Sequence, residues 1–207
     1  MKHEWKKSEK EVYLPKTTPA QIIIPEFKYI MISGKGDPNK PDFSEKVGVL
    51  YNMAYAIKMM PKQGFTPQGY FDYTVYPLEG IWDLSDEGKQ LETLNKDELI
   101  YTIMIRQPDF VTREVFERAY SHLTAKRGSS PLLNEVSYGV LNDGLCVQMM
   151  HIGAFDEEQK SFDFMKEYCL ENHLSRTDLR HREIYISDFR KTAPDKLKTV
   201  LRYFVKK

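Results

Sequence analysis

The sequence predicts an α+β fold in which two pseudo-symmetric β-α-β-β units form an antiparallel sheet, with helices on one face and a ligand cleft on the other. Hydrophobic residues make up 41% of the 207 residues, which is enough for a substantial core. Residues 29–37 and residues 147–156 repeat one order: apolar strand, glycine, acidic residue, amphipathic helix. The repetition indicates a duplicated unit. Two such units side by side put the helices on one face of a sheet and leave a concave, uncovered face that can line a cavity.

The strands are predicted where β-rich or apolar runs lie between turn residues. These runs are residues 22–32, 70–76, 99–105, 136–141, 145–152 and 183–186. Pro25 interrupts the first of them, which suggests an edge position or a bulge. Residues 78–82 turn away from the second strand, and the polar residues 83–97 form a connector. Asn142-Asp143-Gly144 is typical of a tight turn, so the fourth and fifth strands are expected to form a hairpin.

The helices are predicted from apolar residues at helical spacing. They are expected around residues 47–57, 115–123, 156–170 and 194–204. Pro61 and Gly64 end the first helix, and Thr112 can cap the second. Asp156 with Gln159 resembles a capping box, and Pro194 can begin the last helix. Residues 126–131 are expected to form a loop.

The chain is expected to contain a loosely held arm and one ligand-binding domain. Residues 1–19 are charged and contain Pro15 and Pro19, so we assign them to the arm. The domain covers residues 20–207, with its two repeats at about 20–110 and 111–207.

Charge and cysteine content narrow the classes of function. Thirty lysine and arginine residues balance thirty aspartate and glutamate residues, so the formal net charge is +0 and the basic excess of a nucleic-acid binder is absent. Cys146 and Cys169 are too few for a disulfide scaffold and lack metal-ligand spacing. The charged N-terminus does not resemble a signal peptide, and no apolar segment approaches the length of a membrane span. We expect a cytoplasmic protein without metal or cofactor, whose partner is a small molecule rather than nucleic acid or membrane.

Glu183 is the main candidate for a catalytic group. Strand alternation puts Glu183 and Tyr185 on one face and Ile184 and Ile186 on the other. If the isoleucines face the helices, the carboxylate faces the cavity, where it can pair with a cationic ligand or act as a base. The alternative is a glutamate at the rim, paired with Arg182 or His181.

Aromatic residues are the candidates for the wall of the pocket. The chain has 13 Tyr and 11 Phe, and tyrosine is common in pocket walls because its ring is apolar and its hydroxyl polar. Trp82 lies just past a turn at Gly80 and can cover a pocket mouth; Tyr101 shares a strand face with Ile103. Tyr73, Tyr55 and Phe110 are weaker candidates, and each of these aromatic residues can equally be ordinary core. Tyr185 and Met150 complete the predicted ligand-binding set.

His151 has three open interpretations. It can be a general base, a haem ligand, or a structural histidine held by hydrogen bonds beside Gly153. We include it among the ligand-binding candidates. The sequence contains neither a glycine-rich phosphate loop nor a serine nucleophile elbow.

Several of these motifs together resemble the GyrI-like small-molecule-binding family. They are residues 73–82 (YTVYPLEGIW), 104–110 (MIRQPDF), 147–153 (VQMMHIG), 181–188 (HREIYISD) and 194–202 (PDKLKTVLR). The resemblance covers almost all of the chain after the arm. It implies two β-α-β-β units with a ligand cleft between them and a carboxylate at the pocket floor, which falls on Glu183.

The last motif is similar to a stand-alone branch of that family. Members of this branch are enzymes that hydrolyse the cyclopropane ring of DNA-alkylating cyclopropanoid natural products within an aromatic cage. Trp82 and Tyr101 fall where the branch has aromatic residues, although this chain has Trp82-Asp83 where the branch often has two tryptophans.

The resemblance leaves more than one function open. The first hypothesis is a detoxifying hydrolase in which Glu183 activates water and tyrosine hydroxyls, including that of Tyr101, polarise a carbonyl group. The second is a binding protein that sequesters xenobiotics without turnover. A third, haem carriage, depends on His151 alone.

Overall fold

A computed structural model describes residues 2–128 and 130–207, with only the backbone at Arg127. The predicted loop at residues 126–131 thus includes one residue, Ser129, that lies outside the described residues. The strands are β1 (Ala20–Lys35), β2 (Leu78–Leu84), β3 (Leu99–Gln107), β4 (Ser137–Ile152), β5 (Ser175–Tyr185) and β6 (Lys198–Lys206). The α-helices are α1 (Trp5–Ser8), α2 (Lys10–Tyr13), α3 (Pro41–Lys58), α4 (Arg113–Arg127), α5 (Pro131–Asn134) and α6 (Gln159–Glu171). None of the described helices is both long and apolar enough to cross a membrane.

The strand and helix content confirms a mixed fold with an antiparallel sheet. The hydrogen-bonded strand order is β1-β3-β2-β5-β6-β4, and this sheet closes into a barrel. The sheet was predicted as open and is closed instead, and the ligand cleft on its other face stays a prediction. The main elements follow one another as β1-α3-β2-β3, then α4, then β4-α6-β5-β6. This order matches two β-α-β-β units, and their pseudo-symmetry stays a prediction.

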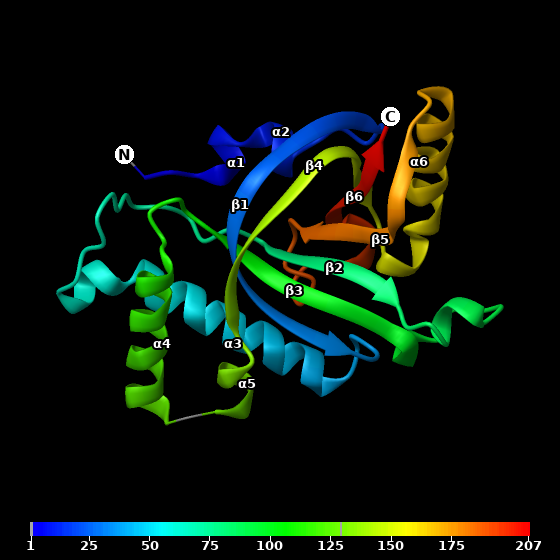
Figure 1. Cartoon of the computed structure of the whole chain (residues 1–207). Helices are drawn as coiled ribbons and strands as arrows, with labels where there is room; N and C mark the ends of the chain where they lie inside the picture. The colour runs from blue at the N-terminus through cyan, green and yellow to red at the C-terminus, as the bar shows by residue number, and fades with distance from the viewer. Residues whose placement is uncertain (1, 129) are drawn as a thin grey trace. The chain divides into compact units, whose positions relative to one another are not determined.

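The chain divides into two compact units. Unit 1 contains Met1–Glu4, Phe27–Tyr76 and Leu84–Leu141, and unit 2 contains Trp5–Glu26, Pro77–Asp83 and Asn142–Lys207. In unit 1, β1 and β3 pair in antiparallel register from Lys28 opposite Gln107 to Lys35 opposite Ile100. Helix α3 packs against β3 and against α4 (Figure 1). Its predicted apolar stripe is confirmed, because Leu50 and Ile57 are fully buried.

Helix α4 begins where its cap was predicted. The Val115 backbone N–H donates to the hydroxyl oxygen of Thr112 at 3.3 Å, which satisfies one of the free N–H groups of the first turn.

Helix α3 ends close to the predicted position. A short 3-10 helix (Met60–Gln63) follows it and ends at Gly64, whose φ of 84° is left-handed. The predicted end of α3 at Pro61 and Gly64 is therefore confirmed.

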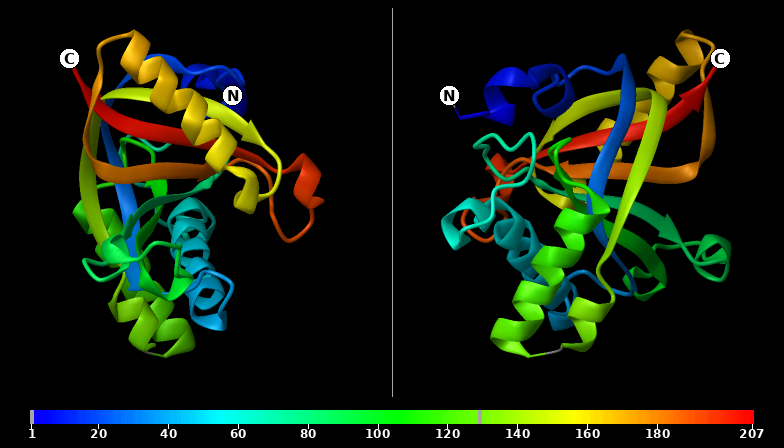
Figure 2. Two further views of the ribbon diagram at one scale, coloured as in Figure 1. Left: turned by 90° about the vertical axis from the view of Figure 1, so that its right-hand side faces the viewer. Right: turned by 60° about the vertical axis from the view of Figure 1, so that its left-hand side comes forward.

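Unit 2 is organised by helix α6, which lies against the strands β5 and β6 (Figure 2, left). Strand β6 is central, pairing in antiparallel register with β4 on one side and β5 on the other. The core beneath α6 joins the helix to β4 and β6 through Met165, Cys169, Val147, Met149 and Leu201.

Residues 5–13 are not loosely held. Trp5 and Tyr13 are buried in α1 and α2, with their ring centroids 5.1 Å apart. The Gln148 side chain of β4 donates to the backbone carbonyl of Glu11 at 2.6 Å. A buried aromatic pair and a bond to the sheet hold this segment, which its charged composition did not reveal. The domain boundary after residue 19 stays a prediction.

The predicted hairpin is wrong, because β4 runs as one strand through Asn142-Asp143-Gly144. Gly144 has a φ of 64°, and its N–H donates to the Asn142 side chain at 3.0 Å. These are local features of a turn, but here they bend the strand without reversing it. The Asp143 carboxylate instead accepts from Arg182 at 2.7 Å and from Arg202 at 3.4 Å.

Residues 194–204 do not form the predicted last helix. Only Pro194–Lys196 form one short 3-10 turn, and the rest is β6. This strand is buried on both faces, so its apolar residues do not alternate with polar ones as they do in a half-exposed strand. Such a run cannot be distinguished from a buried helix by its periodicity. The residues predicted as strand at 70–76 form only an isolated bridge, between His3 and Tyr73, and β2 follows at the predicted turn.

Asp143 should be essential for the stability of unit 2. Arg182 and Arg202 have side-chain exposures of 0% and 1%, so Asp143→Asn would take a carboxylate from two buried guanidinium groups, of which Arg182 keeps its ion pair with Glu79. We expect a loss of about 3–5 kcal/mol in the free energy of unfolding, measured by urea denaturation.

Asp178→Asn is the matched control for this prediction. Asp178 also binds an arginine at 2.7 Å, but that side chain, Arg180, is 52% exposed. Its loss should cost about 0–1 kcal/mol. Equal losses in the two variants would show that burial of the arginines does not set the importance of Asp143.

Candidate functional site

The side chains of β5 alternate as predicted, but the direction of the two faces is reversed. His181 and Glu183 lie on the face that α6 covers, since Phe162 of α6 contacts the His181 ring edge-on at 4.9 Å. Arg182 and Ile184 lie on the opposite face, where Arg182 is paired with Asp143. The prediction that Ile184 packs against the helices is therefore wrong. The argument that put Glu183 on the floor of an uncovered sheet face fails with it.

Glu183 is buried beneath α6 and both of its carboxylate oxygens have partners. The Tyr185 hydroxyl donates to Oε2 at 2.8 Å, and Nε2 of His181 is 3.0 Å from Oε1. The Trp82 indole N–H in turn donates to the Tyr185 hydroxyl oxygen at 2.9 Å. Trp82, Tyr185 and Glu183 thus form a directed chain of hydrogen bonds that ends on the carboxylate.

Gly80 makes room for this chain on β2. It stands opposite Glu183 in the antiparallel β2–β5 pairing. A Cβ atom at Gly80 would lie 2.7 Å from the Trp82 indole nitrogen, so the ring lies directly over the glycine. The absence of a side chain at this position lets the indole lean across the strand and reach Tyr185.

A second carboxyl group, Glu158, meets Glu183 from the helix side. Glu158 immediately precedes α6 and is 6% exposed. Burial, then the charge of Glu183 and a hydrogen bond with it, raise the pKa of Glu158 far above its usual range. The positive end of the α6 dipole opposes this shift but does not reverse it. At neutral pH Glu158 is therefore a neutral acid hydrogen-bonded to Glu183, and we call these two residues the carboxyl pair.

Aromatic rings surround the carboxyl pair. Phe155 contacts Tyr185 edge-on at 5.9 Å and Phe189 at 6.4 Å, and both phenylalanines are 38% exposed. On the other side, Phe162 stacks on Tyr203, with centroids 5.5 Å apart and planes 9° apart. Burial and the charge of Glu183 raise the pKa of Tyr185 well above its ordinary value, so its hydroxyl stays protonated.

The remaining predicted residues of unit 2 occupy different surroundings. His151 is 2.9 Å from the Ser161 hydroxyl through Nδ1 and 3.1 Å from the Ala154 carbonyl through Nε2. Both ring nitrogens are thus engaged, which agrees with the structural interpretation and leaves neither for haem iron. Met150 is next to it in β4, so its side chain points to the opposite face, and its N–H donates to the Lys16 carbonyl at 2.8 Å.

Tyr101 and Tyr55, both in unit 1, differ in burial. Tyr101 is 2% exposed, lies over Gly34 and packs edge-on against Phe43 at 5.2 Å. Burial and the nearby Asp42 raise the pKa of Tyr101 to about 12. Tyr55 is 51% exposed. Their assignment as site residues stays a prediction.

Tyr73 and Phe110 lie in an aromatic cluster of unit 1. Phe110 contacts the rings of Tyr70, Phe71 and Tyr73 edge-on at 5.2–5.9 Å. The Tyr73 hydroxyl is buried without a hydrogen-bond partner among the described residues, and burial raises the pKa of Tyr73. A binding role for either residue also stays a prediction.

Sequence reasoning missed Glu158 and the exposed Phe155 and Phe189. Residues 156–158 are three consecutive acidic residues before a helix, a pattern that usually indicates solvated charges at a helix N-terminus. Nothing in this pattern tells which of the three carboxyl groups is buried. In the described part of the chain, no group of three His, Cys, Asp or Glu side chains is placed to hold a metal ion.

The carboxyl pair can transfer protons in both directions. Glu158 is a proton donor at neutral pH because its raised pKa keeps it protonated. Glu183 accepts hydrogen bonds and has the Tyr185 phenol beside it as a further donor. A buried carboxyl group with a raised pKa beside a second carboxyl group is typical of sites that combine a general acid with a general base.

The raised pKa of Glu158 predicts a pH-dependent stability. Above the ordinary carboxyl pKa the unfolded chain releases this proton while the folded chain keeps it, so wild-type stability falls as pH rises towards the raised pKa. Glu158→Gln removes this loss. Its advantage over wild type should grow by up to about 1.4 kcal/mol per pH unit between about pH 5 and pH 8, measured by urea denaturation.

Glu157→Gln provides the control at the neighbouring position. Glu157 is exposed and pairs with Lys160 at 3.5 Å, so its stability difference from wild type should stay nearly constant over this pH range. A difference for Glu158→Gln that does not change with pH would contradict a buried, protonated Glu158.

Gly80→Ala should displace the Trp82 indole. The added methyl group would be 2.7 Å from the indole nitrogen, so the ring must shift and its bond to Tyr185 must break. We expect a loss of about 1–3 kcal/mol in stability and a shift of the Trp82 indole N–H resonance. Gly48→Ala is the control, because nothing lies within 4 Å of its Cβ position in α3. The free energy of unfolding of Gly48→Ala should rise by about 0.5–1 kcal/mol. An unchanged Trp82 indole N–H resonance in Gly80→Ala would refute the close approach of the ring to Gly80.

Solved structures of similar sequence come from Listeria innocua. One, described as a hydrolase, is 38% identical, with a TM-score of 0.88 over 99% of this chain and 100% of that chain. Another, described as an uncharacterized conserved protein, is 39% identical, with a TM-score of 0.90 over the same shares. The C-terminal domain of EcmrR has the same fold at 15% identity, with a TM-score of 0.54 over 92% of this chain and 98% of that domain.

Among curated proteins, no sequence matches this chain. A family model does, and it covers residues 18–205, which include β1 to β5, all but the last residue of β6, helix α6 and the carboxyl pair. This coverage and the 38% identity to a protein that spans the whole chain agree on one assignment. The chain belongs to the family of GyrI-like small-molecule-binding domains.

Proposed function

We propose that this protein binds flat, largely apolar small molecules and hydrolyses the cyclopropane ring of DNA-alkylating cyclopropanoid natural products, a detoxifying reaction. The observation that carries the proposal is the carboxyl pair itself, two buried carboxyl groups in contact, of which Glu158 has its pKa raised to about 10 by burial and by Glu183. A protein that only binds apolar molecules gains nothing from two buried carboxyl groups, because burying them costs stability. The description of a 38%-identical relative as a hydrolase supports the same direction.

Ring opening of such a substrate needs one acid and one base. The cyclopropane is conjugated to a dienone, so its cleavage sends an electron pair to the carbonyl oxygen. Glu158 donates its proton to that oxygen, while water forms a C–O bond at the ring carbon as the strained C–C bond breaks. Glu183 takes the proton that the water loses. The product is a single molecule that carries a new alcohol and a new phenol, and the net reaction consumes one water.

The hydrogen bond between the two carboxyl groups completes the cycle. After ring opening Glu183 carries a proton and Glu158 has lost one, which inverts their resting states. Since they are hydrogen-bonded to one another, the proton passes back to Glu158, whose pKa is raised by burial. The Tyr185 and His181 contacts hold Glu183 in position during both steps.

Phe155 and Phe189 are the surfaces on which a flat substrate would stack. They are partly exposed beside Tyr185, whereas Trp82 is 5% exposed and its N–H is engaged. Trp82 therefore acts in this proposal as a support for Tyr185, and the two phenylalanines replace it as the stacking wall. Stacking on such rings typically contributes about 1–3 kcal/mol to binding.

The second candidate function is binding without turnover. The observation that favours it is the burial of both carboxyl groups, because Glu158 is only 6% exposed and Glu183 only 9% exposed, which limits the access of water to them. Under this alternative Glu183 serves as the counter-ion of a cationic ligand. We further propose a cytoplasmic location, which suits Cys146 and Cys169 as free buried thiols.

Multiple turnovers on a cyclopropanoid substrate should depend on both carboxyl groups. Glu183→Gln keeps the size of the side chain but cannot accept the proton from water, and Glu158→Gln cannot donate one. Each variant should lose at least about 10²-fold in single-turnover rate while its dissociation constant changes little. Ring-opened product is followed by mass spectrometry with substrate in excess.

Glu157→Gln is again the control and should keep the wild-type rate, because Glu157 is exposed and pairs with Lys160. If wild type and Glu183→Gln open the ring at equal rates, the base role is refuted. If no protein yields product, and Glu183→Gln instead weakens binding of cationic dyes, the chain is a binding protein.

A further inference from the structure

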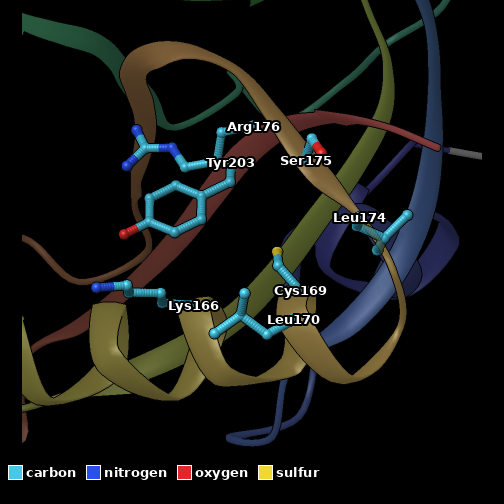
Figure 3. Close-up of a pocket in the computed structure, with 7 residues that line it drawn as sticks. All are labelled: Lys166, Cys169, Leu170, Leu174, Ser175, Arg176 and Tyr203. Atoms are coloured by element: carbon cyan, nitrogen blue, oxygen red, sulfur yellow. The ribbon is translucent and has the colours of Figure 1, made fainter.

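A cavity of about 260 Å³ lies between the second half of α6 and the strands β5 and β6. An apolar cavity of about 150 Å³ holds benzene, so this one has room for a two-ring molecule. Its lining residues divide by chemistry. In Figure 3 the amine of Lys166, the hydroxyl of Tyr203 and the guanidinium of Arg176 lie on one side, while Leu170, Leu174 and Cys169 lie on the other.

The polar side carries two positive charges without carboxylate partners. Among the described residues, neither Lys166 nor Arg176 forms an ion pair. Arg176 stacks on the Tyr203 ring at 3.8 Å and donates to the carbonyls of Leu179 and Arg180, and its Nε is buried without a hydrogen-bond partner. The nearby Asp178 carboxylate binds Arg180 instead. Asp178 also acts on Arg176 at longer range, but an anionic group at this end would pair directly with both cations.

The Tyr203 hydroxyl adds a neutral donor at the same end. Burial raises the pKa of Tyr203 to about 12, so the phenol stays protonated at neutral pH. Asp163 is close enough to act on Tyr203, but it does not line the cavity and accepts a hydrogen bond from Gln159 at 2.8 Å.

The apolar side is open to solvent at Leu170, which is 70% exposed, while Leu174 is 6% exposed. A large exposed leucine at the mouth of a cavity is covered when an apolar ligand enters. Cys169 is buried, and burial raises the pKa of its thiol, so it contributes an uncharged wall.

We propose that this cavity is a second binding site, which takes a small organic anion with a flat apolar body. The body lies against Leu170 and Leu174, and the anionic group meets Lys166, Arg176 and the Tyr203 hydroxyl. Neither Glu158 nor Glu183 lines this cavity. The proposal therefore does not depend on the hydrolase activity.

2-Naphthoate and its cationic analogue, 2-naphthylmethylammonium, test the proposal by NMR titration of the full chain. The backbone amides of Leu170 and Leu174 report this cavity, and the indole N–H of Trp82 reports the carboxyl pair. We expect 2-naphthoate to shift the leucine amides saturably at concentrations that leave the indole unmoved. The ammonium compound should not shift them. Lys166→Met should weaken binding at least about fivefold, since it removes a charged hydrogen-bond donor.

Lys160→Met is the matched control in the same helix, because Lys160 pairs with Glu157 and does not line the cavity. It should bind 2-naphthoate as wild type does. Leu170→Glu, at an exposed position, should abolish binding by putting a negative charge at the apolar end. Three results would each overturn the proposal: equal affinities for the two probes, equal affinities of Lys166→Met and Lys160→Met, or shifts confined to the Trp82 indole.

Discussion

Strand β5 carries ionisable side chains on both of its faces, and both faces are covered. Buried charges are tolerated only when they are paired, hydrogen-bonded or neutralised by a proton. On one face Arg182 is neutralised by Glu79 at 2.9 Å and by Asp143 at 2.7 Å. On the other face burial and the charge of Glu183 raise the pKa of Glu158, so Glu158 keeps a proton. The need to compensate buried charge thus accounts for the position of Asp143 in β4 on one face and for the protonated Glu158 on the other.

The position of Glu158, the proposed acid, is set by the packing of the fold. The start of α6 must lie on β5 for Glu158 to meet Glu183, and the core beneath α6 holds it there. Trp82 and Tyr185 add a hydrogen-bond chain that fixes Glu183, and Gly80 makes the close approach of the indole possible. The carboxyl pair therefore depends on packing by three separate parts of the chain, and not on a local motif.

Predictions from the sequence were correct where a secondary-structure pattern is local, or where several motifs together indicate the family. The α3 stripe, the Thr112 cap and the strand at residue 99 need only neighbours along the chain. It failed where a segment is buried on both faces. Residues 198–206 show no alternation of apolar and polar residues, so they were predicted as a helix. Asn142-Asp143-Gly144 has the composition of a turn, but its aspartate pairs with Arg182 and Arg202, which are distant in sequence.

The sequence by itself determined the GyrI-like assignment, the mixed fold, and the alternation of Glu183 against Ile184, because these follow from motifs and from the geometry of a strand. Only the tertiary structure decided which face of β5 lies under α6 and that Glu158 joins Glu183 there. The physical reason is that alternation separates two faces without saying what covers each. A carboxyl group becomes an acid through the burial and the neighbouring charge that long-range packing provides.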